Sequence, residues 1–147
     1  MEGECAMLDE FIVNYCKNDI RDLSGFDCTE CISVELGHFV MRAYPDQGCV
    51  NDLGTVHGGF LLALADMAAA GAADSYGKAN ATMTVSANFL RSVDVNVDYF
   101  DIDATVVHAG RRTLVVEVTM TRPDGKVAFK STYTMAVVGE KLLPQGW

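Results

Sequence analysis

The sequence predicts an α+β domain in which about six antiparallel strands form a curled sheet around a long central helix. Residues 58–77 predict the helix, because they are rich in alanine and leucine, contain no proline and are apolar on every side. From residue 82 onward the pattern changes to alternating apolar and polar residues, which is typical of antiparallel strands with one covered face. A helix that is apolar all round needs cover on every side, and a curled sheet provides it.

The other elements follow from the same periodicities. Apolar residues at helical spacing in residues 4–17 predict an amphipathic N-terminal helix, within residues 1–20, that docks on the domain through its apolar stripe. The glycines and the proline of residues 45–58 indicate a loop before the central helix, and Gly37 indicates a turn. Strands are expected in six segments, which are 30–36, 38–44, 82–89, 99–106, 113–120 and 127–137.

Length, charge and hydropathy exclude several classes of protein. A chain of 147 residues is typical of one domain, so we expect a single domain over residues 1–147. The net charge of −9 argues against general binding to nucleic acid or to an anionic membrane. We find no apolar run long enough to cross a membrane, and the acidic start is unlike a secretory signal. We therefore expect a cytoplasmic protein.

The cysteines and the acidic residues predict no metal site. The five cysteines are odd in number and all lie in the first third of the sequence, so we expect reduced thiols and no disulfide framework. Cys28 and Cys31 are spaced like half of a zinc site, but no two further ligands follow at suitable spacing. Four aspartates between residues 94 and 103 predict a solvated edge. Metal binding there is the minor alternative, because no glycine-bearing calcium loop accompanies them.

Asp66 is the strongest functional signal. It is the only polar side chain between Gly59 and Ala73. An ionised carboxylate in an apolar helix is costly unless it is paired or hydrogen-bonded, and aspartate has only middling helix propensity. Perturbed carboxylates collect at active sites, which favours a functional role. A helix face turned toward a water pocket, or a structural partner for a buried donor, is the alternative explanation.

The segment His57-Gly58-Gly59 lies where the loop becomes the helix. The first amides of a helix have no intrahelical partner, and together with the helix dipole they favour negative charge. Such a helix start suits an oxyanion that develops on a carbonyl oxygen. A plain glycine-rich entry turn is the alternative explanation.

Geometry separates these two signals within one chain. His57 and Asp66 are nine positions apart, so along an ideal helix they lie about 13 Å apart and face opposite ways. They cannot act as a catalytic pair inside one chain. If both serve one reaction, a two-fold dimer must place the helix start of one chain beside Asp66 of the other.

The spacing N-x-x-G-x-x-H-G-G-x6-D from Asn51 to Asp66 resembles the hotdog-fold acyl-CoA thioesterases, and most of all the phenylacetate-degradation (PaaI-like) branch. The segments 88–92 (NFLRS) and 108–113 (HAGRRT) are also similar to that family. The resemblance covers roughly residues 30–138, which are expected to form the hotdog core. It implies a long helix wrapped by an antiparallel sheet, and subunits that join sheets edge to edge. It also implies a homodimer with shared sites, often as a dimer of dimers, that is a homotetramer.

The resemblance further implies roles for individual residues. Gly58 would offer its N–H to the thioester carbonyl of an aryl- or fatty-acyl-CoA, while Asn51 and His57 would hold the loop and the acyl thioester. Asp66 of the partner chain would activate water as a general base or attack as a nucleophile. A hydroxyl at Thr82 or Thr84 would position the water, and period two places both threonines on one face.

The CoA ester is then the substrate, and no cofactor is expected. Because CoA carries several phosphates and the protein is acidic, its binding needs a local basic patch. The resemblance points to a set of CoA-contacting residues, which are Gly59, Arg91, Gly110, Arg111 and Arg112.

Two other functions stay open on the sequence. A hotdog domain could bind acyl-CoA without turnover as a regulatory module, although we see no attached DNA-binding segment and the charge is unsuitable. An enoyl-CoA hydratase or dehydratase could use the same fold, although such relatives usually pair a histidine with a carboxylate differently in the helix.

Overall fold

The computed structural model describes residues 9–18 and 23–142. Its strands form one six-stranded sheet in the order β1-β2-β4-β5-β6-β3, and every neighbouring pair is antiparallel. The elements are α1 (Glu10–Asn18), the 3₁₀ turns η1 (Phe26–Cys28) and η2 (Gln47–Cys49), α2 (Gly58–Asp74), β1 (Thr29–Glu35), β2 (His38–Ala43), β3 (Ala79–Phe89), β4 (Phe100–Ala109), β5 (Thr113–Thr121) and β6 (Val127–Gly139).

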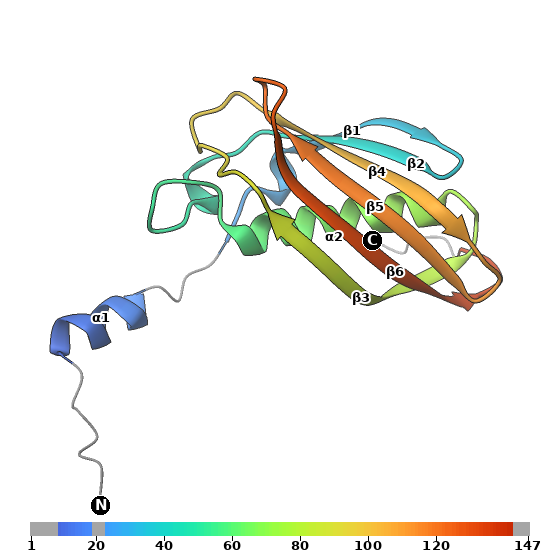
Figure 1. The fold of residues 1–147 in the computed structure, drawn as a ribbon, viewed down its shortest axis with the longest axis horizontal. Coiled ribbons are helices and arrows are strands. Elements are labelled where there is room, and N and C mark those ends of the chain that lie inside the picture. Colours follow the sequence, from blue (N-terminus) through green and yellow to red (C-terminus); the bar gives the residue numbers. More distant parts are fainter. Residues whose placement is uncertain (1–8, 19–22, 143–147) are drawn as a thin grey trace, which may run out of the picture.

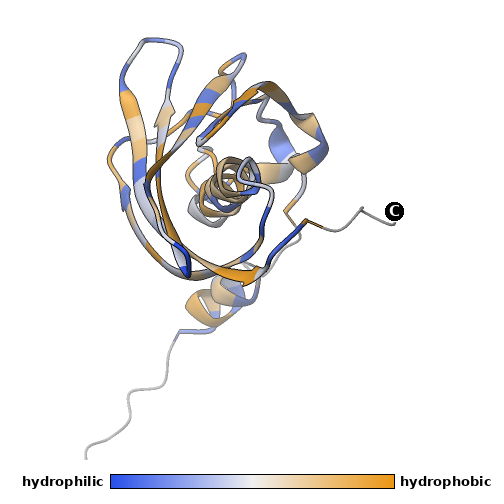
Figure 2. Ribbon diagram, turned by 90° about the vertical axis from the view of Figure 1, so that its right-hand side faces the viewer, coloured by the Kyte–Doolittle hydropathy of each residue, from blue (hydrophilic) through white to orange (hydrophobic). Residues whose placement is uncertain are grey.

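The sheet curls around α2, as Figure 1 shows from the side and Figure 2 shows with the helix end-on. Leu64, Ala65, Ala68 and Ala69 of this helix are completely buried against the inward face of the sheet. Burial of each large apolar side chain stabilises the fold by about 1.5–3 kcal/mol, so this contact holds the domain together. The predicted α+β architecture, with its helix-wrapping sheet of six strands and its N-terminal helix, is confirmed.

The C-terminal end of α2 is fixed by Ser75, the residue that caps it. The Ser75 hydroxyl donates to the Ala72 carbonyl at 2.6 Å and accepts from the Gly37 N–H at 2.7 Å. Gly77 follows with φ +74°, a left-handed conformation that glycine adopts at little cost. The helix therefore ends at Asp74, three residues before the predicted end at residue 77.

One irregularity in β3 changes which side chains face the helix. Thr82 pairs with Met135 and Thr84 pairs with the adjacent Thr134, so the strand bulges at Met83. A bulge of one residue reverses the alternation of faces. Thr82 shares the inward face with Val85, whereas Thr84 points to the outer face. The expectation that both threonines lie on one face is therefore wrong.

The N-terminal helix is placed differently from the prediction. It begins at Glu10, and residues 4–8 of the predicted helix lie outside the described part of the chain. Phe11 is 74% exposed and Tyr15 is 52% exposed, and Figure 1 places α1 away from the body of the domain. The expected docking through the apolar stripe is wrong. The Tyr15 hydroxyl instead donates to an Asp52 carboxylate oxygen at 2.8 Å.

None of the described helices is both long and apolar enough to span a membrane. Four of the cysteines lie in the described part of the chain and are free thiols, namely Cys16, Cys28, Cys31 and Cys49.

Candidate active site

The first half of the site is the start of α2. His57 caps the helix, because its Nδ1 accepts a hydrogen bond from the Gly59 N–H at 2.9 Å. Its own N–H donates to the Cys49 carbonyl at 2.7 Å, which fixes the entry of the chain into the helix. The Gly58 N–H has no acceptor among the described residues. This amide is therefore available to donate a hydrogen bond to a ligand.

Asn51 organises the loop before that helix. Its side-chain oxygen accepts from the backbone N–H groups of Leu53 at 2.9 Å and Thr55 at 3.1 Å. Its amide nitrogen donates to the Thr55 hydroxyl at 2.8 Å. The oxygen and the nitrogen of the Asn51 side chain thus both help to hold the loop.

A hollow of about 330 Å³ lies over this helix start. It is lined by Asn51, Thr55, Val56, Gly58, Leu61, Phe89, Leu90, Arg91 and Ser92. The ring of Phe89 closes tightly on the glycine, because a Cβ placed on Gly58 would lie 3.3 Å from Phe89 Cε1. The start of α2 at Gly58 therefore packs against the C-terminal end of β3.

The second half of the site is Asp66 with its neighbours. The Thr82 hydroxyl donates to Asp66 Oδ1 at 2.6 Å, a short charge-assisted hydrogen bond across from β3 to α2. The bulge at Met83 creates this contact, because it turns Thr82 toward the helix. Asp66 is half-buried and lies in a hollow of about 290 Å³ whose other lining residues are Gly59, Leu62, Ala63, Thr82, Val85 and Tyr133.

Tyr133 forms the floor of this second hollow. The side chain is only 1% exposed, and its hydroxyl donates to the Leu62 carbonyl at 2.8 Å. Burial raises the pKa of the Tyr133 hydroxyl, and the negative charge of Asp66 raises it further. The hydroxyl is thus a fixed neutral donor, and apart from Asp66 and Thr82 the hollow is apolar.

The two halves do not meet within one chain. The hollows that contain Gly58 and Asp66 share no lining residue. Eight residues of helix separate Gly58 from Asp66, a rise of about 12 Å. As expected from the sequence, the start of α2 and Asp66 are therefore too far apart to act together within one chain.

The remaining predicted site residues are spread over three places. Gly59 lines the Asp66 hollow, and Arg91 lines the Gly58 hollow while donating to the Val127 carbonyl at 2.8 Å. The turn that carries the other residues closes with a Gly110 N–H bond to the Thr113 carbonyl at 2.8 Å. Arg111 lines a third hollow, and the Arg112 carbonyl accepts from the Val137 N–H.

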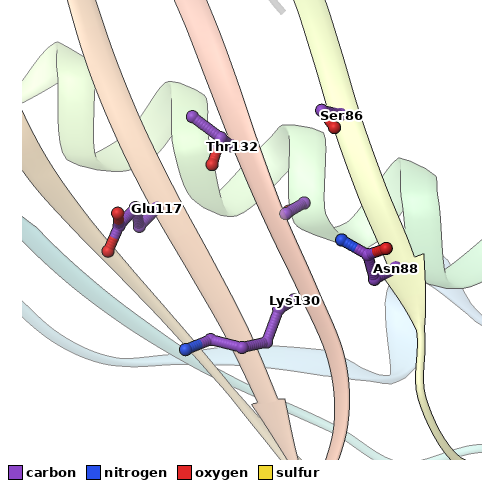
Figure 3. Close-up of a pocket in the computed structure, with 6 residues that line it drawn as sticks. Ser86, Asn88, Glu117, Lys130 and Thr132 are labelled. Atoms are coloured by element: carbon purple, nitrogen blue, oxygen red, sulfur yellow. The ribbon is translucent and has the colours of Figure 1, made fainter.

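The outer face of the sheet carries polar side chains that take no part in either half. Figure 3 shows Ser86, Asn88, Glu117, Lys130 and Thr132 around a shallow hollow of about 240 Å³ on strands β3, β5 and β6. Thr84 lies on this outer face too.

The aspartates between residues 94 and 103 are partly paired. Asp101 holds Arg42 through two hydrogen bonds, and Asp103 lies 2.9 Å from His38, while Asp94 and Asp98 are exposed. Within the described chain no three His, Cys, Asp or Glu side chains are grouped closely enough to hold a metal ion.

Comparison with known families identifies the superfamily of the chain. The profile of the thioesterase superfamily matches residues 53–129, which include the Asp66 helix and most of the sheet. The chain belongs to the thioesterase superfamily. No curated protein matches it significantly.

Several solved structures superpose closely on the chain. A hypothetical thioesterase from Streptococcus pneumoniae, solved with coenzyme A, is 30% identical with a TM-score of 0.79, over 83% of this chain and 98% of its own. A Streptococcus mutans protein bound to acetyl-CoA is 31% identical with a TM-score of 0.76, over 84% and 98%. The Escherichia coli PaaI protein of the phenylacetic acid degradation operon is 26% identical with a TM-score of 0.75, over 78% and 83%. The resemblance to the PaaI-like branch is confirmed.

The pneumococcal hypothetical thioesterase was also solved as two alanine variants, one at an aspartate and one at a threonine. Those two positions are sixteen residues apart, which is also the separation of Asp66 and Thr82 in this thioesterase-family chain.

Sequence reasoning missed three residues beside these hollows. Phe89 and Tyr133 belong to alternating strands, where an inward aromatic residue is read as ordinary core. Lys78 follows the turn at Gly77 and lines the hollow of Arg111. The alternation of β6 predicts that Tyr133 faces inward. It does not predict that Tyr133 lies close to Asp66.

Proposed function

We propose that the protein is an acyl-CoA thioesterase whose reaction centre is shared by two subunits. The observation that carries the proposal is the Asp66–Thr82 hydrogen bond of 2.6 Å in an otherwise apolar hollow beside an open sheet edge. The relatives bound to coenzyme A and acetyl-CoA support a CoA ester as the ligand. The alanine variants of the pneumococcal relative show that it carries an aspartate and a threonine at this same spacing, which supports a shared arrangement of the pair.

Strand β3 offers the surface for the second subunit. Among the described strands it pairs only with β6, so its other edge is open over eleven residues. Its side chains include Met83, which is 56% exposed, and Phe89, which is 54% exposed. Long apolar edge strands readily pair with another chain. A second copy that adds its own β3 would cover these residues and continue the sheet.

Antiparallel self-pairing of β3 would complete the site. Asp66 contacts Thr82 near the start of β3, whereas Gly58 contacts Phe89 at the end of it. In a two-fold antiparallel pair, the start of one strand lies beside the end of the other. The partner's Gly58 then approaches Asp66, although the two residues are far apart within one chain. Each dimer has two such sites.

In the proposed reaction, the partner's Gly58 N–H polarises the thioester carbonyl and stabilises the oxyanion. Asp66 takes a proton from a water molecule, and the water oxygen attacks the carbonyl carbon. Thr82 holds the carboxylate and leaves its other oxygen for that water. The tetrahedral intermediate collapses with cleavage of the C–S bond, the CoA thiolate takes up the proton, and a carboxylic acid is released. The acyl group lies against Leu62, Ala63 and Val85.

Subunit mixing tests the shared site directly. Asp66→Asn and Gly58→Pro are purified separately, and each is expected to lose about 10²-fold or more in the release of free thiol from a panel of aryl- and fatty-acyl-CoA esters. After unfolding and refolding together, half of the dimers are mixed and each mixed dimer has one intact site. We expect activity to return to roughly a quarter of the wild type.

Each variant refolded alone is the control and stays inactive. If mixing restores nothing while native mass spectrometry shows the mass of the mixed dimer, the shared centre is wrong. If the wild type binds acyl-CoA tightly and releases no thiol, the protein is a binding module. Formation of a hydroxyacyl product from enoyl-CoA would identify a hydratase instead.

A further inference from the structure

Tyr133 of β6 is bound to the same turn of α2 that carries Asp66. Its hydroxyl donates to the Leu62 carbonyl at 2.8 Å. In an α-helix this carbonyl also accepts the N–H four residues later, which here is the N–H of Asp66. We propose that Tyr133 is a positioning residue that fixes the backbone of Asp66, so that the free oxygen of its carboxylate meets the attacking water. This inference rests on the proposed function, because it concerns the same acid.

The turn around Asp66 lies on the less covered side of α2 within one chain. Leu64 and Ala65 are completely buried against the sheet, whereas Asp66 is half-buried and Met67 is 44% exposed. Apolar packing therefore restrains this side of the helix less than the opposite side. A hydrogen bond from the sheet to this turn supplies a restraint that packing does not.

Two neighbouring strands hold Asp66 at different atoms. The Thr82 hydroxyl on β3 donates to Asp66 Oδ1 at 2.6 Å, while the Tyr133 hydroxyl on β6 acts on the backbone through Leu62. Tyr133 pairs with Val85, three residues after Thr82, so both restraints come from the same pair of strands. With its backbone and one oxygen fixed, the carboxylate keeps its other oxygen in one direction. A misplacement of about 1 Å in such a group can cost about 10²-fold in rate.

The surroundings of Tyr133 restrict its hydroxyl to this task. The side chain is almost completely buried and lines the Asp66 hollow. Burial raises the pKa of the hydroxyl, and the charge of Asp66 raises it further, so the group keeps its proton at neutral pH. A hydroxyl has only one proton to donate, and the Leu62 carbonyl accepts it. Tyr133 therefore acts through Asp66 and does not donate to the substrate.

Tyr133→Phe removes only the hydroxyl, and Ser131→Ala is its matched control. Ser131 lies two residues earlier on the same inward face of β6, is 6% exposed, and its hydroxyl has no hydrogen-bond partner among the described residues. In the thiol-release assay we expect Tyr133→Phe to lower kcat about fivefold or more and to keep KM within about twofold. Ser131→Ala should keep both constants within about twofold of the wild type. Urea unfolding verifies that both variants are folded.

A double-mutant cycle with Asp66→Asn separates positioning from a general loss of stability. In the Asp66→Asn background, Tyr133→Phe should lower the residual rate by less than about twofold, because the carboxylate that it positions is gone. An equal fractional loss in both backgrounds overturns the inference. So does a folded Tyr133→Phe variant with the kcat of the wild type, or an equal loss in Ser131→Ala.

Amide hydrogen exchange measured by NMR tests the restraint without any hydrolysis. We expect Tyr133→Phe, but not Ser131→Ala, to speed exchange of the Asp66 amide about fivefold or more relative to the Ala72 amide of the same helix. If the wild type releases no thiol but the exchange changes in this way, the proposed function fails and the restraint on Asp66 stands. If the exchange is also unchanged, both are wrong. If the wild type is active and Tyr133→Phe is equally active, the positioning role is wrong and the thioesterase stands.

Discussion

Replacing Gly58 with proline removes one backbone N–H and adds a ring whose Cβ would lie 3.3 Å from Phe89 Cε1. Gly58 is the first residue of α2, a position that tolerates proline because its N–H has no intrahelical acceptor. The preceding His57 has φ −61° and ψ 134°, the extended conformation that a following proline favours. We expect Gly58→Pro to keep its free energy of unfolding within about 1 kcal/mol of the wild type.

The expected loss of activity follows from the role of the amide. Removal of one oxyanion donor lowers kcat by about 10²–10³, or about 2.7–4 kcal/mol of transition-state stabilisation. Gly58→Ala is the matched control, because it retains the N–H and adds a Cβ 3.3 Å from Phe89 Cε1. A contact of this kind moves the ring by a few tenths of an ångström, so Gly58→Ala is expected to stay within about tenfold of the wild type.

The assay is the release of free thiol from acyl-CoA, with kcat and KM determined for wild type and both variants. Urea unfolding shows whether the proline variant is folded. If folded Gly58→Pro retains more than a tenth of the wild-type kcat, the amide does not stabilise the oxyanion. If Gly58→Ala loses as much as Gly58→Pro, the cause is crowding against Phe89 and not the missing N–H.

Three further predictions concern the surroundings of the site. Thr82→Val should lower kcat about tenfold or more through loss of its bond to the carboxylate of Asp66, whereas Thr84→Val on the outer face should stay within about twofold in the same assay. Gly71→Ala adds a Cβ only 2.8 Å from the ring of Phe39. We expect this overpacking to outweigh the gain in helix propensity, so urea titrations should show a free energy of unfolding lower by about 1–2 kcal/mol. The pKa of Tyr133 is raised in the folded protein, so its contribution to stability is complete below pH ~10 and is lost as the pH rises further. In Tyr133→Phe, the free energy of unfolding should not show this decrease at alkaline pH.

The architecture was predictable because its two main signals are local. A helix with apolar residues on every side requires cover on every side, and the alternating segments provide the strands for it. The position of Asp66 was predictable for the same reason, because a lone carboxylate in such a helix must have a polar partner. The separation of Gly58 from Asp66 needed only the rise of a helix.

Other features depend on contacts that local patterns do not specify. The alternation of residues 82–89 continues unbroken through Met83, so nothing in it reveals the bulge that turns Thr82 and Thr84 to different faces. The pattern of α1 shows that one face is apolar but not what lies against that face. Lys78 belongs to no motif, and its place beside Arg111 comes from the pairing of β3 with β6.

The extra residue at Met83 also affects how related chains are compared. A relative whose third strand runs without this insertion must carry its hydroxyl one position nearer to the strand centre to reach the same acid. An ungapped alignment would then match that hydroxyl to Met83, and an alignment that shifts by one residue to pair hydroxyls would match it to Thr84 on the wrong surface. Superposition of coordinates, in which the loop of backbone is visible, assigns it to Thr82.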